Sequence, residues 1–384
     1  MRILFVYTHT IHGGGETYLL RIIDGIDKTE FEPFVAISKR NVRLAKDLET
    51  RRIPYVALPD MNLLWKNKVA KALVQLPNFI MMNCAIGWLI LKERIRVVHA
   101  GMFYSALFSV IPAKVLGRRF LWTALTEPDI VRYPALTNLL LRLSDRTVSV
   151  CKYFVNLARS ENAPCIEKMQ VIYTGLTDDR FLTRKPAGEL NVNGYDIPRY
   201  IVALIARFDE SQKGHRYFWE MAARVHKAVP KANFVVAGAP ADDAGEDFRK
   251  RLIKMADEFG IAKNLFLIGH IKDIPEFLSG IDILILPSTH EGAPVVVQEA
   301  AAAGKPVVAF PAGGTGELMK DGETGFVVPM KDAGALADRV IALLSDQKMM
   351  RAMGENGKRF AEERFREGPF IRTYERLYTS LASR

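Results

Sequence analysis

The chain alternates short, uninterrupted apolar runs with longer stretches in which apolar residues recur at helical spacing. Apolar runs of about four to eight residues are typical of strands buried on both faces of a parallel sheet. Regular alternation of such strands with helices predicts an α/β fold whose parallel sheets carry helices on both faces. The predicted strands form two series, 3–7, 34–37, 55–58, 97–99, 120–124, 147–150 and 170–173, then 200–206, 233–237, 265–268, 282–286, 306–309 and 325–328.

Residues 175–198 separate the two series and are rich in Gly, Pro, Asn and charged residues, which is typical of a linker. A chain of 384 residues is also too long for one ordinary hydrophobic core and suits two domains. We therefore predict two doubly wound, Rossmann-like domains facing across a cleft, residues 1–175 and residues 176–365. Residues 366–384 are expected to be helical and to pack back on the first domain.

Residues 281–303 combine a predicted strand, a loop and a helix with two carboxylates. Glu291 lies in the loop, and Glu299 lies within a helix that is expected to have Pro294 in its first turn and to be buried. A helix N-terminus offers unpaired N–H groups and a positive dipole end, so it favours an anion. Two carboxylates beside an anion site suit a ligand that carries both phosphates and hydroxyls. The alternative is an ordinary strand–helix turn in which Glu299 is paired in the core.

Two cations follow the first strand of the second series. Arg207 comes directly after the predicted strand 200–206, and Lys213 precedes the next helix. Ligands of open parallel sheets bind beyond the carboxyl ends of the strands, so both side chains are expected to reach the same region as Glu291. Arg binds phosphate oxygens bidentately, and Lys acts as a point charge. This arrangement predicts a diphosphate site, and the alternative is a pair of solvated surface charges.

A glycine loop follows the first predicted strand. It does not match the G-x-G-x-x-G pattern of dinucleotide-binding folds, because Tyr18 stands at the third glycine position counted from Gly13. This mismatch disfavours an NAD-dependent oxidoreductase. Glycine still lets a ligand approach the backbone at a helix start, so Gly13 and Gly14 are candidate phosphate or sugar contacts. A structural turn is the alternative.

The net charge of +10 resides in the first half of the chain. Residues 1–175 contain 24 Lys and Arg against 14 Asp and Glu, whereas the remaining residues contain 29 of each kind. This excess predicts that the first domain meets an anionic surface or substrate. Three cysteines without a close pair indicate a reducing compartment. The apolar runs are too short for a signal peptide core or for a membrane span of about 20 residues, so a cytoplasmic protein is expected.

Taken together, these elements resemble the retaining nucleotide-sugar glycosyltransferases of the GT-B fold, specifically the large group-four family. The similarity covers nearly the whole chain. The motifs that carry it are Arg207 with Lys213, the E-x7-E element from Glu291 to Glu299, and the GGGE loop at 13–16. The segments VVHA and VIYTGLTDDRF, which begin at residues 97 and 171, are also similar to the family's. The resemblance implies a first domain that binds the acceptor and a second domain that binds the sugar donor.

The resemblance also implies roles for individual residues. Arg207 and Lys213 would hold the diphosphate of the sugar donor, Glu299 would bond the ribose hydroxyls, and Glu291 would face the sugar. Arg207, Lys213 and Glu291 would thus be the catalytic residues. The loop at 269–271 would border the nucleobase, and backbone N–H groups next to Pro294, which has none itself, would hold the phosphate or sugar. The other residues implied near the sugar donor are Gly13, Gly14, Glu16, Gly269, Ile271, Gly292, Ala293, Pro294 and Val295.

The first domain departs from the family pattern at one point. Many members carry a His where Leu125 stands in this chain, and Glu127 is a candidate replacement. We expect His99 and His12 to be structural or loop residues. No Asp-x-Asp occurs in the chain, so no metal and no other cofactor is expected. In the reaction that the family suggests, the acceptor hydroxyl attacks from the face that the diphosphate leaves, and the diphosphate takes its proton.

The expected activity is therefore retaining hexosyl transfer from a UDP- or GDP-sugar to an acceptor hydroxyl, in lipopolysaccharide, polysaccharide or glycolipid synthesis. A sugar-nucleotide epimerase of GT-B-like fold and a non-catalytic nucleotide-sugar-binding protein are the alternatives. Expected partners are a glycan or lipid-linked acceptor and an anionic membrane surface, but no nucleic acid. Peripheral docking on the inner face of the membrane is expected through the apolar run 79–91, whose alternative is a core-facing helix, and through Trp65, Lys66, Lys68 and Lys71.

Overall fold

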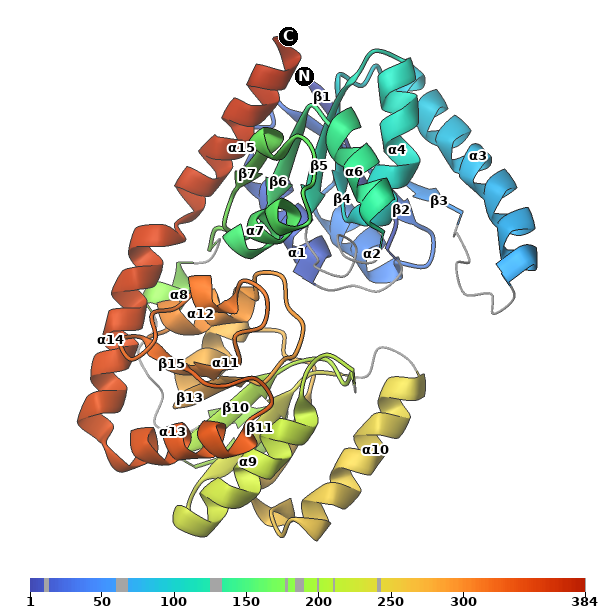
Figure 1. Ribbon diagram of the computed structural model, residues 1–384. Coiled ribbons are helices and arrows are strands. Elements are labelled where there is room, and N and C mark those ends of the chain that lie inside the picture. Colours follow the sequence, from blue (N-terminus) through green and yellow to red (C-terminus); the bar gives the residue numbers. More distant parts are fainter. Residues whose placement is uncertain are drawn as a thin grey trace. The chain divides into compact units, whose positions relative to one another are not determined.

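The structure is a computed structural model, which describes residues 1–9, 14–59, 68–124, 133–176, 179–183, 190–198, 200–209, 211–239 and 243–383. The chain divides into two compact units (Figure 1). The first unit comprises Met1–Gly175 with Glu367–Arg384, and the second comprises Leu176–Arg366. Each unit is built on one parallel sheet with helices packed on it, which confirms the predicted pair of parallel-sheet α/β domains.

The sheet of the first unit has the strand order β3-β2-β1-β4-β5-β6-β7, and all of its paired strands are parallel. Each strand overlaps a predicted one, and the central strands β1, β4 and β5 are buried along nearly their whole length, because a strand covered on both faces needs apolar side chains on both. The seven strands are β1 (Arg2–Tyr7), β2 (Glu32–Ser38), β3 (Tyr55–Leu58), β4 (Val97–Gly101), β5 (Arg119–Ala124), β6 (Arg146–Ser149) and β7 (Met169–Val171).

The C-terminal helix α15 (Glu367–Ala382) packs within the first unit, against α1 (Gly14–Gly25) and β4. Its buried face presents Tyr374 and Tyr378, four residues apart and therefore on one side of the helix. The Tyr374 hydroxyl lies 2.5 Å from that of Tyr18, and the Tyr378 hydroxyl lies 2.8 Å from His99 Nδ1. The remaining helices of this unit are α2 (Val42–Thr50), α3 (Lys68–Lys92), α4 (Phe103–Val115), α6 (Pro134–Leu143), α7 (Lys152–Ser160) and the short η1 (Ile166–Lys168).

The sheet of the second unit has the strand order β12-β11-β10-β13-β14-β15 and is also parallel. Its core contains Phe218 and Trp219 of α9 and Phe234 of β11, all fully buried. The strands are β10 (Ile201–Ile205), β11 (Asn233–Ala237), β12 (Leu265–Gly269), β13 (Ile283–Leu286), β14 (Val307–Ala309) and β15 (Gly325–Val327). The helices are α8 (Arg180–Thr183), α9 (His215–Ala228), α10 (Asp243–Glu258), η2 (Ala262–Asn264), α11 (Ile274–Gly280), α12 (Val295–Ala302), η3 (Thr315–Glu317), α13 (Ala333–Ser345) and α14 (Gln347–Arg364).

The prediction of a linker at 175–198 is wrong for the residues that form an antiparallel hairpin, β8 (Leu190–Val192) and β9 (Tyr195–Ile197). The two turn residues, Asn193 and Gly194, have φ of 50° and 84°, the left-handed region that Asn-Gly hairpin turns require. Asn193 Nδ2 donates to the carbonyl oxygen of Ile268 at 2.7 Å. The hairpin is therefore part of the second unit.

Several predictions concern residues or side chains outside the described part of the chain. These are His12, Gly13, Trp65, Lys66, Leu125 and Glu127, together with the side chains of Lys68 and Lys71.

Among the described residues, none of the helices combines the length and the apolar character needed to cross a membrane.

Candidate functional site

The loop after β10 holds Arg207 through a carboxylate that the sequence prediction did not single out. Asp209 accepts a hydrogen bond from Arg207 Nη2 at 3.0 Å, and its other oxygen accepts bonds from the Ser211 hydroxyl and from the N–H groups of Ser211 and Gln212. Burial raises the pKa of Asp209, but the hydrogen bonds from Ser211 and the charge of Arg207 outweigh it and hold that pKa below its usual value. An ionised Asp209 thus positions Arg207 just beyond β10.

Lys213 and Glu291 belong to two different loops and form an ion pair, with Lys213 Nζ 2.8 Å from Glu291 Oε1. The two side chains are 22% and 11% exposed, so the pair is partly shielded from water and still accessible. Both residues were predicted to reach one ligand region, and the structure brings them into direct contact. A charge pair of this kind can exchange partners with an anionic ligand, because the ammonium group has three donors and this contact uses one.

Two glycines allow neighbouring loops to approach each other around this pair. Gly214 has φ of 66°, and a Cβ there would lie 1.9 Å from the carbonyl oxygen of Pro287. Gly313 has φ of 53°, and a Cβ there would lie 1.9 Å from the carbonyl oxygen of Glu291. Any other residue would collide with backbone and would also be strained. The loops after β10, β13 and β14 therefore converge beyond the carboxyl ends of three neighbouring strands, where open parallel sheets bind ligands.

Helix α12 begins beside this cluster, at Val295. Pro294 is its N-cap rather than a member of its first turn, which corrects the prediction, and no side chain among the described residues caps it. Gly292 accepts a backbone hydrogen bond from Gly314 at 2.7 Å, which holds the loop that also contains Ala293. The helix N-terminus therefore presents backbone N–H groups toward the same region as Lys213, an arrangement that favours an anion.

Glu299 is the fifth residue of α12 and is half-buried, whereas its neighbour Gln298 is completely buried. Within the described part of the chain, neither amide atom of Gln298 has a hydrogen-bond partner, and we have no physical account of that. The prediction of a buried helix is confirmed for most of α12. The structure keeps Glu299 on the partly accessible side, where a ligand could reach it.

The end of β12 and the loop after it contain the two residues implied at the nucleobase. Gly269 ends the strand with φ of 74°, a left-handed conformation that glycine adopts without strain, and Ile271 is buried. Asn193 of the hairpin β8–β9 donates to the carbonyl oxygens of Ile268 at 2.7 Å and His270 at 3.2 Å. The hairpin therefore steadies this loop, a contribution that sequence reasoning missed.

The residues predicted in the first unit have a different environment. Gly14 opens α1, and a Cβ there would touch nothing, so packing does not require glycine at this position. Glu16 is 2% exposed and accepts a bond from Asn41 Nδ2 at 3.4 Å, while His9 Nδ1 lies 4.0 Å away. Glu16 is therefore a buried residue with a structural partner in Asn41. The contact of Glu16 with the sugar donor stays a prediction.

Two buried histidines are structural, His99 in the middle of β4 and His215 at the start of α9. His99 is fully buried, and its ring nitrogens lie within 2.8 Å of Tyr378 and 2.6 Å of Thr123. Burial lowers the pKa of His99 to about 3 and, at the start of α9, lowers the pKa of His215 to about 4. His215 stacks on Phe208 with ring centroids 5.2 Å apart. Both rings are therefore neutral near pH 7 and belong to the packing of their units.

Comparisons with known proteins show what the chain is similar to. Residues 191–360 match the family model described as Glycosyl transferases group 1. N-acetyl-α-D-glucosaminyl L-malate synthase of Bacillus anthracis is 29% identical over 127 residues, which cover 33% of this chain and 33% of that protein. The UDP-Gal:α-D-GlcNAc-diphosphoundecaprenol α-1,3-galactosyltransferase of Escherichia coli is 26% identical over 193 residues, or 49% of this chain and 48% of that protein. The chain thus spans about a third to a half of the length of these curated relatives.

A solved structure is similar over the whole chain. HepE of Anabaena, in complex with UDP and glucose, superposes with a TM-score of 0.80 at 20% sequence identity, and the match covers 99% of this chain and 100% of that one. At this level of identity the likeness establishes the fold, which is GT-B. The match of residues 191–360 shows that this segment is similar to group 1 glycosyltransferases.

Proposed function

We propose that the protein transfers a hexosyl group from a nucleoside-diphosphate sugar, a UDP- or GDP-sugar, to an acceptor hydroxyl with retention of configuration. The observation that carries the proposal is the partly shielded Lys213–Glu291 pair beside the N-terminus of α12, which no described side chain caps. Both lie within the segment that matches group 1 glycosyltransferases. The UDP and glucose in the HepE complex support a donor of this class.

Arg207 and Lys213 are the proposed diphosphate ligands. The contact with Asp209 engages Nη2 of Arg207, and the other guanidinium N–H groups remain available to phosphate oxygens. The Lys213 ammonium group would donate hydrogen bonds to the diphosphate in place of its contact with Glu291. The N-terminus of α12 would add backbone N–H groups from Ala293 and Val295. Glu291, relieved of its cation, would then accept hydrogen bonds from sugar hydroxyls.

The proposed reaction breaks the bond between the anomeric carbon and the diphosphate oxygen and forms one bond from that carbon to the acceptor oxygen. The acceptor proton passes to the departing diphosphate, so atoms and charges balance without a further reactant. Negative charge grows on the diphosphate as it leaves, and fixed cations with helix N–H groups stabilise such charge. No metal is needed in this scheme, because Arg207, Lys213 and the helix supply the neutralisation.

Glu299 is the proposed ribose ligand, and the loop from Gly269 to Ile271 is the proposed border of the nucleobase. The acceptor would bind to the first unit. A lipid-linked or glycan acceptor of cell-envelope synthesis is favoured by the name of the Escherichia coli relative, which specifies a diphosphoundecaprenol acceptor. The proposed place of action is therefore the cytoplasmic face of the membrane.

A panel of UDP-, GDP- and ADP-sugars tests the proposal. A bound ligand stabilises the native state, so the true sugar donor should raise the melting temperature of the protein and should be consumed when an acceptor is added. Transfer of the sugar to the acceptor is the expected result. Conversion of the nucleotide sugar into its epimer, or binding without turnover on every acceptor offered, would overturn the proposal in favour of an epimerase or a binding protein.

A further inference from the structure

The second half of helix α3, residues 79–91, is apolar on two opposite sides. Its inward side is completely buried in the core of the first unit, through Met82, Ile86, Leu89 and Ile90. At 3.6 residues per turn, a second set of apolar residues falls together on the other side. Its members, Ile80, Met81, Cys84, Trp88 and Leu91, are all exposed. Residues 79–91 were predicted either to dock on a membrane or to form a core-facing helix. The core-facing helix accounts for the buried side of this segment and leaves its exposed apolar side unexplained.

The exposed apolar surface continues onto α4. The two helices pack side by side, and Gly87 of α3 faces Pro112 of α4. Ile111 and Val115, which flank this contact on α4, are 42% and 78% exposed, and Trp88 is 57% exposed. We call Ile80, Met81, Trp88, Leu91, Ile111 and Val115 the apolar face. Clusters of large exposed apolar side chains on one surface mark interaction sites, whereas scattered single ones do not.

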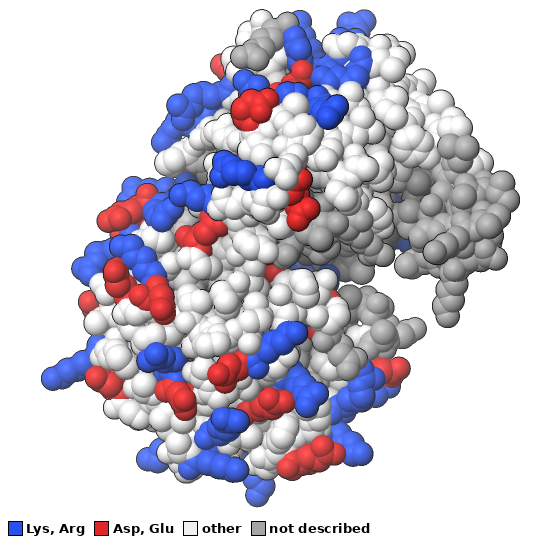
Figure 2. Space-filling view, viewed as in Figure 1, with Lys and Arg blue, Asp and Glu red and all other residues white. Residues whose placement is uncertain are grey.

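A dense group of cations adjoins this face. The chain leaves α3, α4 and α6 at the edge where β4, β5 and β6 begin. Residues 92–96, 114–119 and 142–146, which make these three connections, contain eight Lys and Arg against two acids, Glu93 and Asp145. We call them the basic edge, and Figure 2 shows blue side chains gathered where Figure 1 shows these strands beginning. Much of the excess charge of residues 1–175 lies here.

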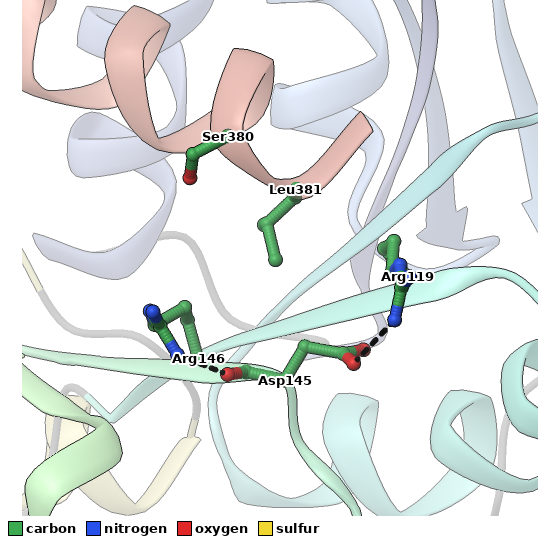
Figure 3. A pocket seen from close by; sticks show the side chains of 5 residues that line it. All are labelled: Arg119, Asp145, Arg146, Ser380 and Leu381. Atoms are coloured by element: carbon green, nitrogen blue, oxygen red, sulfur yellow. Dashed lines mark hydrogen bonds and ion pairs between the residues drawn. The ribbon is translucent and has the colours of Figure 1, made fainter. Parts of the chain in front are cut away.

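The two acids of the basic edge do not neutralise it, and four of its cations, Lys92, Arg94, Arg96 and Arg142, are exposed. Asp145 already pairs with Lys114 and Arg119, and Glu93 pairs with Arg2. Figure 3 shows Arg119 and Arg146 at the wall of a small hollow of about 50 Å³ beneath the end of α15. At the C-terminal end of α3, the Lys92 ammonium lies 4.5 Å from the centre of the Trp88 ring, which joins the basic edge to the apolar face.

We propose that the apolar face and the basic edge together dock the first unit on a lipid bilayer with anionic headgroups. Trp88 and the aliphatic side chains would enter the boundary between headgroups and acyl chains, the region that exposed Trp prefers. The cations of the basic edge would meet the headgroup phosphates and carboxylates. A second copy of the chain fits less well, because an isologous interface contains the same patch twice and would bring two basic edges into one contact.

Vesicle co-sedimentation of the full chain tests the docking surface. Binding should require vesicles in which about one third of the lipid is phosphatidylglycerol, since each cation near such a surface contributes about 1 kcal/mol. The variant Arg94→Gln with Arg142→Gln should therefore bind about fivefold more weakly per removed cation. The variant Trp88→Ser with Leu91→Ser should lose the binding that persists at high salt, where charge attraction is screened.

Matched controls come from exposed residues elsewhere. Lys348→Gln with Arg351→Gln removes two exposed cations of α14, and Val42→Ser removes an exposed apolar side chain of α2; both should bind vesicles like the parent chain. The proposal is overturned if the protein stays in the supernatant with anionic vesicles at low salt, or if the controls lose as much binding as the test variants. It is also overturned if the Trp88→Ser, Leu91→Ser chain only changes from dimer to monomer in sedimentation. Nucleotide binding by the same variants should be unchanged, which separates this inference from the proposed activity.

Discussion

Two clusters of interacting polar side chains, one in each unit, differ in charge and exposure. In the first unit, hydroxyl and imidazole groups of Tyr18, His99, Thr123, Tyr374 and Tyr378 meet beneath α15, and each of these residues is at most 2% exposed. In the second unit the cluster consists of two ion pairs, Arg207–Asp209 and Lys213–Glu291, whose side chains are 11–35% exposed.

The difference separates a structural role from a binding role. Buried neutral groups satisfy one another's hydrogen bonds, and removing one partner lowers the stability of the protein. The first cluster therefore serves to hold the C-terminal helix in place. Partly exposed ion pairs contribute little to stability, and their charges can be transferred to an arriving anion. We therefore expect substitutions in the first cluster to change stability alone and those in the second to change ligand affinity.

The largest effect is expected at the two cations of the second cluster. Lys213→Ala or Arg207→Ala should weaken binding of the nucleoside diphosphate by about 2–5 kcal/mol, as for the loss of one partner in a hydrogen-bonded charge pair. The fold should persist. Isothermal titration calorimetry measures the affinity. Arg216→Ala is the matched control, because its pair with Glu220 lies on the exposed part of α9 and its loss should leave the affinity unchanged. Unaltered affinity in Lys213→Ala and Arg207→Ala would remove the binding role of the cluster.

Substitutions in the first cluster should lower stability and leave nucleotide affinity unchanged. Tyr378→Phe deprives the buried Nδ1 of His99 of its 2.8 Å partner, and leaving such a group unsatisfied costs about 1–3 kcal/mol of unfolding free energy. Urea denaturation measures the loss, and nucleotide affinity should stay at the parent value. Tyr195→Phe, at an exposed tyrosine of β9, is the control and should change neither quantity. A fall in affinity for Tyr378→Phe without a fall in stability would contradict the assignment.

Acid should lower the stability of the protein through His99, one of its buried histidines. Burial lowers the pKa of His99 to about 3, whereas an unfolded chain has a histidine pKa of about 6.5. Below about pH 6.5 the unfolded state therefore binds a proton that the folded state does not, and stability falls until about pH 3. The loss from this residue should reach about 2 kcal/mol at pH 5. Urea denaturation over this range measures it. In His99→Gln the free energy of unfolding should fall less steeply with acid than in the parent chain. His290→Gln, at an exposed histidine, should have the slope of the parent chain. An equal slope for His99→Gln and the parent chain would contradict the role of His99.

The smallest effect is expected at Glu299. Glu299→Gln keeps the shape of the side chain and removes its charge, so a bond to a ribose hydroxyl should weaken by about 1 kcal/mol. A deoxyribose nucleotide lacks that bond and should lose much less affinity from the same substitution. Calorimetric titration with both nucleotides decides the point. Equal losses for the two would mean that Glu299 acts in packing alone.

The sequence predicted the sheets well and the contacts between loops only in part. Strands such as β10 and β13 are continuous apolar runs because both of their faces are covered, and that pattern is visible without a structure. The hairpin β8–β9 was missed, although its Asn193-Gly194 turn is a recognised signal, because its strands are short and the flanking segment resembles a linker. Asp209 was also missed as the partner of Arg207, two positions away.

The pairing of Lys213 with Glu291 shows where sequence reasoning ends. The strand-end rule brought both residues to one region, since β10 and β13 are neighbours in the sheet. The contact itself depends on Gly214 and Gly313, which let the loops approach within backbone distance. Such packing follows from three-dimensional approach and not from spacing along the chain.

The central claim is sugar transfer with retention by a charge cluster that needs no metal. The most direct measurement is NMR of the early product formed in excess EDTA with the sugar donor that the panel identifies. We predict continued turnover and a product whose anomeric configuration equals that of the donor. Activity abolished by the chelator, or a product of inverted configuration, would contradict the proposed mechanism.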